Sequence, residues 1–346
     1  MRRPELRVSE GTFRANIAAV RRRMAPSSLM LVLKDDAYGH GLDWAVRAAE
    51  NSGVDLFGSY DVRSALAVRR VIEGDAGIFA WATSTDAEID EALLSRIDLG
   101  VGTMEYLRRI VARAQVLGVP ARIHLKIDTG LHRNGILADD WAAAVAMVRA
   151  AERAGLIDLK GVWSHIAEAS DAEDDTAQAA FLRAVRTVGE SGAMPEALHL
   201  TASAASWWRP ELRGTVSRVG AFCYGVRSAD GPELEGIRPA ASLVAFVAGF
   251  DGDQARIGIG SFDGLPSTLA GATVGTSSGP VTLTSVGFTD SSVNCWPGAR
   301  VGDEVVLFGP GAHGESSATT LAERIDTVGE EILTRLTPHV RRVAVD

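Results

Sequence analysis

Short apolar runs alternate with amphipathic segments along the first two thirds of the chain. The apolar runs predict eight strands, at residues 29–33, 54–58, 77–80, 97–101, 121–127, 159–165, 197–201 and 215–219. Between most of them apolar residues recur at helical spacing, which predicts helices at 61–72, 85–94, 103–117, 140–154 and 174–190. A short strand at 5–8 comes first, followed by a helix that Ser9 caps and that extends to Met24. Eight strand–helix units in about 215 residues predict an α/β fold, a (β/α)8 barrel of the TIM type.

From Pro239 the pattern changes, because helical periods give way to short alternating runs at 243–250, 255–260, 279–288 and 303–309. Gly, Pro, Asp and Ser separate these runs, which is typical of an antiparallel β domain. One helix is predicted within it, at 319–336. We therefore expect a barrel domain at 1–236 and a mainly antiparallel β domain at 237–346, with residues 1–10 as candidates to pair with the second domain.

The composition narrows the class of protein. The 346 residues suit one large barrel and a second domain, and the net charge of −9 argues against nucleic acid or an anionic membrane as partner. The two cysteines, Cys223 and Cys295, lack metal-like spacing, and we interpret them as reduced core thiols. No signal peptide and no membrane-spanning run is recognisable, so we expect a cytoplasmic protein.

Lys34 is the first residue with candidate chemistry, because it stands where a buried strand ends and a turn-like segment with two glycines begins. A lysine at the mouth of a barrel strand is costly to bury as a charged amine. If it is desolvated, its pKa falls and it becomes a nucleophile that forms a Schiff base with an aldehyde cofactor. The alternative is a surface lysine that happens to follow a strand.

The whole string LKDDAYGHG, residues 33–41, resembles the cofactor signature of the alanine racemase family. In that family the lysine holds pyridoxal 5′-phosphate as a Schiff base. The lysine, Tyr38 and the Gly-His-Gly match, whereas Asp35 replaces the usual alanine. The resemblance implies this cofactor, with Lys34 as its attachment point and Tyr38 among the residues that bind it.

The string HLKIDTGLHRNG after the fifth strand resembles the family's Lys-x-Asp-Thr-Gly-x-x-Arg-x-Gly element. The resemblance implies that Arg133 approaches the phenolic oxygen of the cofactor and the carboxylate of the substrate, a role that suits the fork of a guanidinium. Lys126 matches a lysine that is carbamylated in some relatives and orients the arginine. The alternative for Arg133 is a solvated loop residue.

Two further strand ends extend the resemblance. The sixth strand ends in GVWSHIAEASD, where His165 matches a histidine that lies beside the cofactor and contacts the arginine at its pyridine nitrogen. The resemblance thus makes His165 a candidate catalytic residue with Lys34 and Arg133, although a satisfied core histidine is an equal alternative. HLTASAAS after the seventh strand resembles His-x-Ala-Asn-Ser-Ala, so Ser203 matches a serine that binds the phosphate. Ala202 replaces the usual asparagine, and Ser203 could also be a helix N-cap.

SRVGAFCYG after the eighth strand resembles Arg-x-Gly-Ile-x-x-Tyr-Gly. Arg218 would then face the pyridine nitrogen, and because its pKa is too high to surrender a proton, the ring stays unprotonated. Such a ring is a weaker electron sink, which restrains side reactions such as transamination. Gly220 and Ala221 would offer backbone amides to the phosphate, and Tyr224 is structural.

The second domain departs from the family. Family members use a second base, a tyrosine from the second domain of the partner subunit, but this chain has no tyrosine after Tyr224. The stretch 243–260 that should carry it is shortened, Ser261 replaces a tyrosine, and Glu330 stands where a phosphate-contacting tyrosine is expected. Asp290 remains as a candidate backbone contact to the substrate carboxylate.

The resemblance covers nearly the whole chain and implies a head-to-tail homodimer that racemises a small amino acid. Because the second base is absent, we expect this racemisation to be weak. One alternative is a non-racemising, cofactor-binding or regulatory paralogue. Another is a different reaction at the α-carbon of D- or L-amino acids, such as one-sided proton exchange or retro-aldol cleavage.

Overall fold

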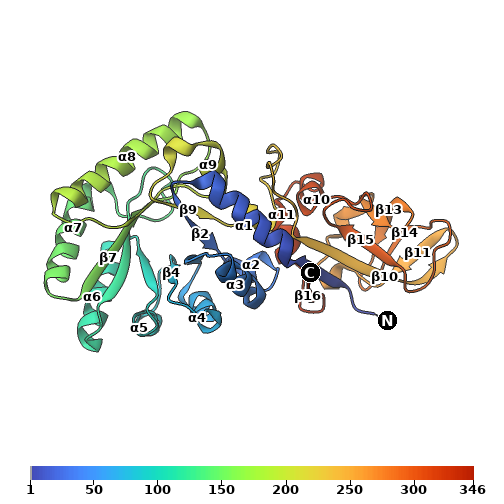
Figure 1. Ribbon diagram of the computed structural model, residues 1–346, viewed down its shortest axis with the longest axis horizontal. Coiled ribbons are helices and arrows are strands. Elements are labelled where there is room, and N and C mark those ends of the chain that lie inside the picture. The colour runs from blue at the N-terminus through green and yellow to red at the C-terminus, as the bar shows by residue number, and fades with distance from the viewer. Residues whose placement is uncertain (1) are drawn as a thin grey trace. The chain divides into compact units, whose positions relative to one another are not determined.

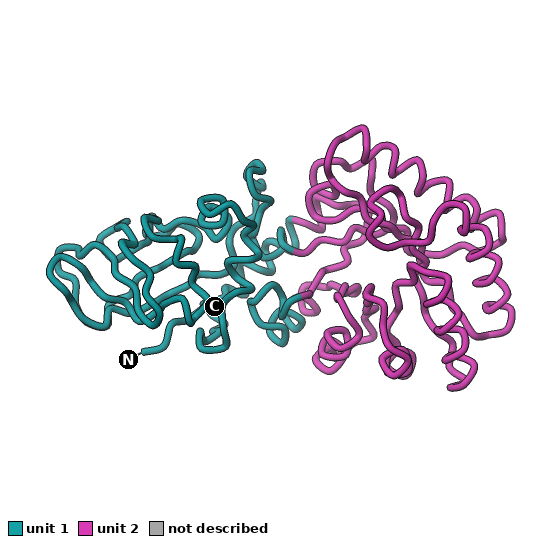
Figure 2. Tube along the Cα trace, turned by 180° about the vertical axis from the view of Figure 1, so that it is seen from behind, with its two compact units in different colours: residues 1–19, 35–48, 221–346 teal, residues 20–34, 49–220 magenta. Residues whose placement is uncertain are grey.

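The computed structural model describes residues 2–346 and divides the chain into two compact units (Figure 2). Unit 1 comprises residues 1–19, 35–48 and 221–346, and unit 2 comprises residues 20–34 and 49–220. Two helices, α1 (Glu10–Met24) and α3 (Leu42–Asn51), contribute residues to both units.

Unit 2 contains eight parallel strands in the order β8-β7-β6-β5-β4-β3-β2-β9, which confirms the predicted barrel (Figure 1). Most of their residues are buried, as expected when helices cover a parallel sheet. All eight overlap the predicted strands. The strands are β2 (Ser28–Val32), β3 (Leu56–Ser59), β4 (Gly77–Ala80), β5 (Asp98–Val101), β6 (Ala121–Lys126), β7 (Ile157–Trp163), β8 (Ala197–His199) and β9 (Val216–Val219).

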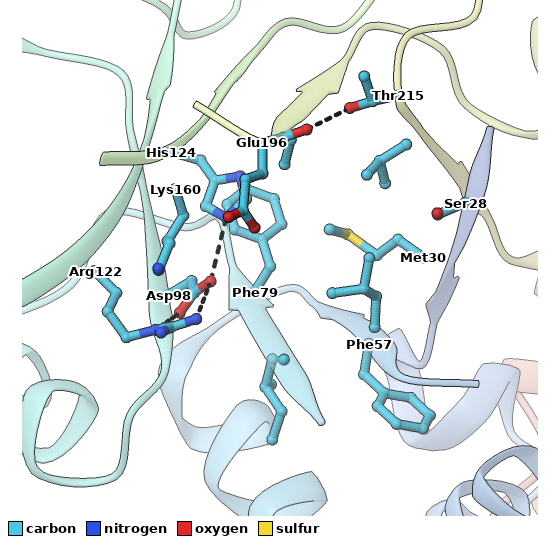
Figure 3. A pocket seen from close by; sticks show the side chains of 15 residues that line it. Ser28, Met30, Phe57, Phe79, Asp98, Arg122, His124, Lys160, Glu196 and Thr215 are labelled. Carbon is cyan, nitrogen blue, oxygen red and sulfur yellow. Dashed lines mark hydrogen bonds and ion pairs between the residues drawn. The ribbon is translucent and has the colours of Figure 1, made fainter. Parts of the chain in front are cut away.

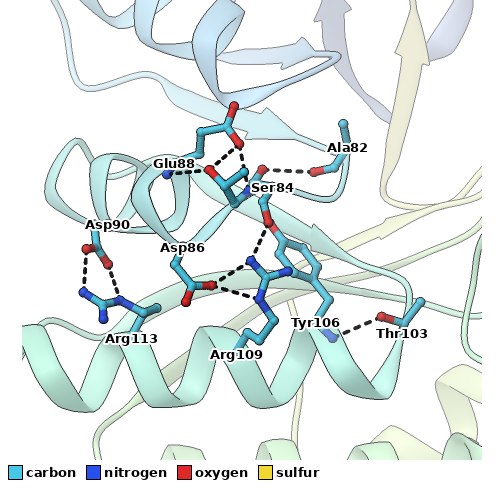
Figure 4. Close-up of polar contacts among 10 residues, drawn as sticks. Ala82, Ser84, Asp86, Glu88, Asp90, Thr103, Tyr106, Arg109 and Arg113 are labelled. Carbon is cyan, nitrogen blue, oxygen red and sulfur yellow. Dashed lines mark hydrogen bonds and ion pairs between the residues drawn. The ribbon is translucent and has the colours of Figure 1, made fainter.

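Helices alternate with these strands, and side-chain caps fix where several of them begin. Thr85 forms a capping box with Glu88 at the start of α5, and Thr103 caps α6. Ion pairs of Arg109 with Asp86, at 2.7 Å, and of Arg113 with Asp90, at 2.6 Å, tie these two helices together (Figure 4). The helices are α4 (Val62–Val71), α5 (Asp86–Leu94), α6 (Met104–Leu117), α7 (Ala138–Arg153), α8 (Asp171–Glu190) and α9 (Ser203–Trp208).

The first and last strands of this order, β8 and β9, meet through side-chain hydrogen bonds. The amide of Leu198 donates to Oγ1 of Thr215 at 2.8 Å, and that hydroxyl donates to the carbonyl of Glu196 at 2.7 Å. The backbones approach so closely that a Cβ on Gly214 would lie 1.9 Å from the carbonyl oxygen of Leu198. A glycine is therefore required at 214 for the barrel to close.

Unit 1 is built on antiparallel strands, as predicted. Six of them form a closed ring in the order β10-β11-β14-β13-β12-β15, and β15 returns to β10. Strand β1 (Glu5–Ser9) pairs antiparallel with β10 and parallel with β16 (Arg341–Val345). The ring strands are β10 (Ala241–Asp251), β11 (Gln254–Ile257), β12 (Thr273–Thr276), β13 (Gly279–Val286), β14 (Ser291–Asn294) and β15 (Glu304–Phe308).

Three expectations for unit 1 need correction. The helix predicted at 319–336 is two short helices, α10 (Ala318–Arg324) and α11 (Gly329–Thr334), because Asp326 adopts a left-handed φ of 57° between them. Strands β12, β14 and β16 were not predicted. Cys223 is buried as expected, but Cys295 is exposed, so it is not a core thiol. Within residues 2–346, none of the helices combines the length and apolar character that a membrane crossing requires.

The seam between β8 and β9 yields a stability prediction. Gly214→Ala should lower the free energy of unfolding by about 1–3 kcal/mol, because the new methyl group meets backbone rather than a movable side chain. Gly189→Ala is the matched control, since a Cβ there meets nothing within 4 Å and the position is helical, so this variant should gain up to about 1 kcal/mol. Denaturant unfolding measures both, and equal stability of the two variants would contradict the account of the seam.

Candidate functional site

Lys34 is followed by a left-handed turn. Asp35, Asp36, Ala37 and Tyr38 all have φ of 53–54°, a region that non-glycine residues rarely adopt. Each such residue costs roughly 1–2 kcal/mol, so the backbone after Lys34 is strained. Strain of this kind gathers at functional sites, and here it follows directly on the predicted cofactor lysine.

Arg218, in β9, is buried and is 5% exposed. Its Nη1 donates to Nδ1 of His199 at 2.9 Å and to the carbonyl of the same residue at 3.1 Å. Its Nη2 donates to the carbonyls of Ser164 and Leu200 and to Nδ1 of His165, at 2.9, 3.1 and 3.2 Å. Burial lowers the pKa of the guanidinium to about 9, so it remains charged at neutral pH.

His165 follows β7 and is the point on which the cations of the site converge. Burial is the main reason that its pKa falls to about 3, and the charges of four side chains act in the same direction. In order of effect these are Arg218, Arg133, Lys126 and Lys34. The structure therefore brings together the predicted residues of β2, β6, β7 and β9 at the carboxyl ends of the strands, and the imidazole of His165 is neutral.

Lys126, the last residue of β6, is 4% exposed. Burial lowers its pKa to about 8, and the charges of Arg218 and Arg133 act in the same direction against that of Asp128. Its Nζ lies 4.5 Å from the ring centroid of Trp163, whose other cationic neighbour is Arg218 at 5.3 Å. The aromatic ring thus supports two of the cations in the site.

Arg133 lies in the loop between β6 and α7, and its side chain is exposed. A bridge between Ile127 and Ile136 closes the base of this loop. Asp128 accepts hydrogen bonds from the amides of Gly130, at 2.9 Å, and His132, at 3.2 Å, and so shapes the loop from within. The exposure agrees with a solvated arginine, whereas the organised loop and the electrostatic effect on His165 agree with a functional one.

Ser203 is the first residue of α9, and Ala202 stands at the N-cap position without a side-chain capping bond. The interpretation of Ser203 as an N-cap is therefore wrong. Its Oγ instead accepts a hydrogen bond from the amide of Gly220 at 3.2 Å, so the hydroxyl and the amide predicted for the phosphate lie side by side. Glu168 accepts from the amide of Ala205 at 2.9 Å in the same region.

The remaining predicted residues belong to unit 1. Tyr38 is 5% exposed, and burial, followed by the charges of Glu330 and Asp35, raises its pKa against the effect of a hydrogen bond with the backbone of Ala221. Tyr224 packs 5.1 Å from Tyr38 in an aromatic cluster and is 1% exposed.

Asp290 is more exposed than these tyrosines and does not belong to the aromatic cluster. It precedes β14, its side chain is 41% exposed, and it lies 3.8 Å from Arg256.

Sequence reasoning missed four buried residues of unit 2, namely Asp98, His124, Trp163 and His199. His124 is the first residue of the string HLK and His199 the first residue of the string HLT. His124 is two positions before Lys126 on β6, so both face the barrel interior, and this alternation was an available signal.

Two family models match the chain: the N-terminal domain of alanine racemase over residues 8–228 and the C-terminal domain of alanine racemase over residues 245–344. The alanine racemase of Thermobifida fusca (strain YX) is 34% identical, with 98% of this chain and 97% of that protein covered. The alanine racemase of Beutenbergia cavernae is 35% identical at the same coverage. The solved alanine racemase of Streptomyces coelicolor A3(2) superimposes with a TM-score of 0.91 at 29% identity, covering 99% of this chain and 98% of that one.

The surroundings of Lys126 predict its titration. Its amine should lose its charge near pH 8, because burial and the neighbouring arginines disfavour the cation, so it is charged below that pH and neutral above it. The chain has three lysines, Lys34, Lys126 and Lys160, so NMR of ¹³C-lysine protein can be assigned by Lys126→Met. A Lys126 signal that titrates only above pH 10 would refute the lowered pKa of this amine. Addition of ¹³C-bicarbonate would show whether the neutral amine is carbamylated.

Proposed function

Because this chain belongs to the alanine racemase family, we propose that it is an isomerase that uses pyridoxal 5′-phosphate to move the α-proton of a small amino acid. One observation carries the proposal: Nη2 of Arg218 donates to Nδ1 of His165 at 3.2 Å, and Lys126 shares the aromatic ring of Trp163 with Arg218. The charges of Lys34 and Arg133 also lower the pKa of His165. The proposal includes a head-to-tail homodimer and a cytoplasmic location. It also includes the domain division at residue 237.

The donor set suits this cofactor, which is anionic and carries a phosphate, a phenolic oxygen and a ring nitrogen. Lys34 would hold the cofactor covalently, and the hydroxyl of Ser203 and the amide of Gly220, already 3.2 Å apart, would hold its phosphate. Tyr38 and Ala221 are proposed as further phosphate contacts on the motif. When bound, the cofactor withdraws electrons from the α-carbon of the amino acid and acidifies its proton.

Arg218 would present an N–H to the ring nitrogen. Its acceptors fix the guanidinium, and an arginine does not give up its proton at neutral pH. His165 accepts from Nη2 of Arg218 through Nδ1, so the neutral ring carries its proton on Nε2. His165 therefore positions Arg218 and does not act as a cationic acid near pH 7.

Arg133 would bind the carboxylate of the substrate, since its guanidinium is exposed and lies on an organised loop. Asp290 is proposed as a second contact to that carboxylate, through its backbone.

The proton-transfer groups are unequal on the two sides of the substrate. Lys34 serves one face, but the described chain has no tyrosine beyond Tyr224 for the other. Burial raises the pKa of Tyr38, Tyr106 and Tyr224, so none of these three is a ready base. Tyr60 is 55% exposed and follows β3 directly. This inequality favours one-sided proton exchange, or a non-racemising paralogue, as the second candidate function.

Lys34 is predicted to be the attachment point of the cofactor. Borohydride reduction of the protein with pyridoxal 5′-phosphate, followed by peptide mass mapping, should place the phosphopyridoxyl group on Lys34. Lys126 and Lys160 are internal controls, because they are the other lysines in the chain. A colourless protein that takes up no cofactor would instead support the regulatory paralogue.

Exchange of the α-proton is predicted to outpace inversion. Loss of a positioned acid or base typically costs about 10²–10⁴-fold in rate, and an aspartate with a pKa of ~4 is a poor substitute for a tyrosinate. In D₂O, deuterium should therefore enter the alanine enantiomer whose α-proton faces Lys34 much faster than that enantiomer inverts.

The contrary outcome is alanine racemisation as fast as deuterium entry. It would show that another residue supplies the second base, and Tyr60→Phe would be the first variant to examine.

A further inference from the structure

Four buried side chains of unit 2 form a continuous chain of hydrogen bonds that ends at Arg218. Nε2 of His124 lies 3.3 Å from Oδ2 of Asp98, and Nδ1 of His124 lies 2.8 Å from Nε2 of His199. Nδ1 of His199 in turn lies 2.9 Å from Nη1 of Arg218. Each of the four is less than 10% exposed, so the chain runs through the interior from β5 by way of β6 and β8 to β9.

The two ends determine the direction of every hydrogen bond. Arg218 only donates, so Nδ1 of His199 must accept, and the proton of the neutral ring is on Nε2. That N–H donates to Nδ1 of His124, whose own proton is then on Nε2 and is donated to Asp98. Burial is the main reason that the pKa of His199 lies well below its usual value, which agrees with a neutral ring.

Asp98 keeps its charge despite its burial. Burial alone raises its pKa, but hydrogen bonds from His124 and Arg122 outweigh this effect and hold the pKa below its usual value. Arg122 donates to both carboxylate oxygens, through Nε to Oδ1 and through Nη2 to Oδ2 at 3.2 Å. The ionised carboxylate has acceptor capacity only, so it cannot reverse the hydrogen bond from His124.

The backbone and side chains around His124 and His199 leave space for this series of hydrogen bonds. A β-bulge between β6 and β7 sets Gly161 opposite His124, and a Cβ at Gly161 would lie 2.3 Å from Nδ1 of His124. On the other side, the ring of Trp163 stacks on His199 with centroids 5.7 Å apart and an interplanar angle of 11°. The two imidazoles are therefore held by packing as well as by hydrogen bonds.

Asp98, Arg122 and His124 line a cavity of about 270 Å³ at the amino ends of the strands (Figure 3). The predicted cofactor residues lie at the opposite, carboxyl ends of the same strands. The chain of hydrogen bonds thus begins at one end of the barrel and reaches the arginine that would face the cofactor at the other.

We propose that Asp98 is a positioning residue for Arg218, because its fixed charge sets the tautomers of His124 and His199 and so keeps a lone pair facing the guanidinium. Without that charge the two imidazoles can reverse, and an N–H of His199 then opposes an N–H of Arg218. The consequence for the cofactor rests on the function proposed above, whereas the tautomers are a property of the protein alone.

The substitution Asp98→Asn makes a sharp test. Arg122 can only donate hydrogen bonds, so it should donate to the amide oxygen of the new asparagine. The NH₂ group of the asparagine then faces His124. The NH₂ group donates to Nε2 of His124, which reverses both tautomers. In the double variant Asp98→Asn, Arg122→Met the amide oxygen is free to turn back, so the original tautomers should return. Arg122→Met alone loses the ion pair but should leave the tautomers unchanged.

Histidine ¹⁵N NMR of the cofactor-free protein reads these states, and the chain has seven histidines to resolve. The unsubstituted protein should show both rings protonated on Nε2, and Asp98→Asn should show both protonated on Nδ1. Asp98→Asn should also release pyridoxal 5′-phosphate roughly tenfold faster, by analogy with the loss of an outer-shell hydrogen-bond partner at a metal site. The double variant should restore slow release.

Protonation of His199 on Nδ1 in the unsubstituted protein overturns the proposal, and this result does not depend on whether any variant folds. Equal effects of Asp98→Asn and Arg122→Met on the tautomers and on cofactor release would also overturn it. Such a result would mean that Asp98 acts only through its ion pair with Arg122. A protein that shows the expected tautomers but takes up no cofactor would refute the proposed function and leave the positioning of Arg218 standing.

Discussion

The burial of a full positive charge on Arg218 is the constraint on which the site depends. An ion of this size in an apolar interior is tolerated only if its donors find acceptors. Three carbonyl oxygens and two imidazole nitrogens meet this need, and they come from segments that follow or end β7 and β8. His165 and His199 must stay neutral to accept hydrogen bonds from Arg218, and burial together with the nearby cations keeps them neutral.

The same constraint explains the state of the other cations. Positive charges on Arg218 and Arg133 disfavour a further charge on Lys126, whose pKa burial has already lowered to about 8. Repulsion among these side chains destabilises the protein by itself, and an anionic ligand would relieve it. The clustering of positive charge is therefore a physical reason, independent of any motif, to expect an anionic ligand at these strand ends.

The sequence was informative where local chemistry decides the structure. The strand ends and the helix cap at Ser9, whose Oγ accepts a hydrogen bond from the amide of Thr12 at 3.0 Å, follow from short stretches of sequence. The sequence was uninformative where contacts between residues far apart in the chain decide the local structure. The break at Asp326 depends on a left-handed residue, and the partner of Ser203 is an amide 17 positions away rather than its own helix. The partners of Asp98 likewise come from other strands, so its role could not be predicted from its neighbours.

Glu330, which we expect at the position of a phosphate-contacting tyrosine of the family, acts electrostatically on Tyr38. A carboxylate near a phosphate is unfavourable by itself. Burial raises the pKa of Tyr38, and the charge of Glu330 raises it further, so the phenol keeps its proton. A protonated phenol is a hydrogen-bond donor, which is the form that would bind a phosphate. Burial is the main reason that the pKa of Tyr38 lies above that of an ordinary tyrosine, which is itself protonated near pH 7. The same protonation prevents Tyr38 from supplying the base that the proposed reaction would need on the second face of the substrate.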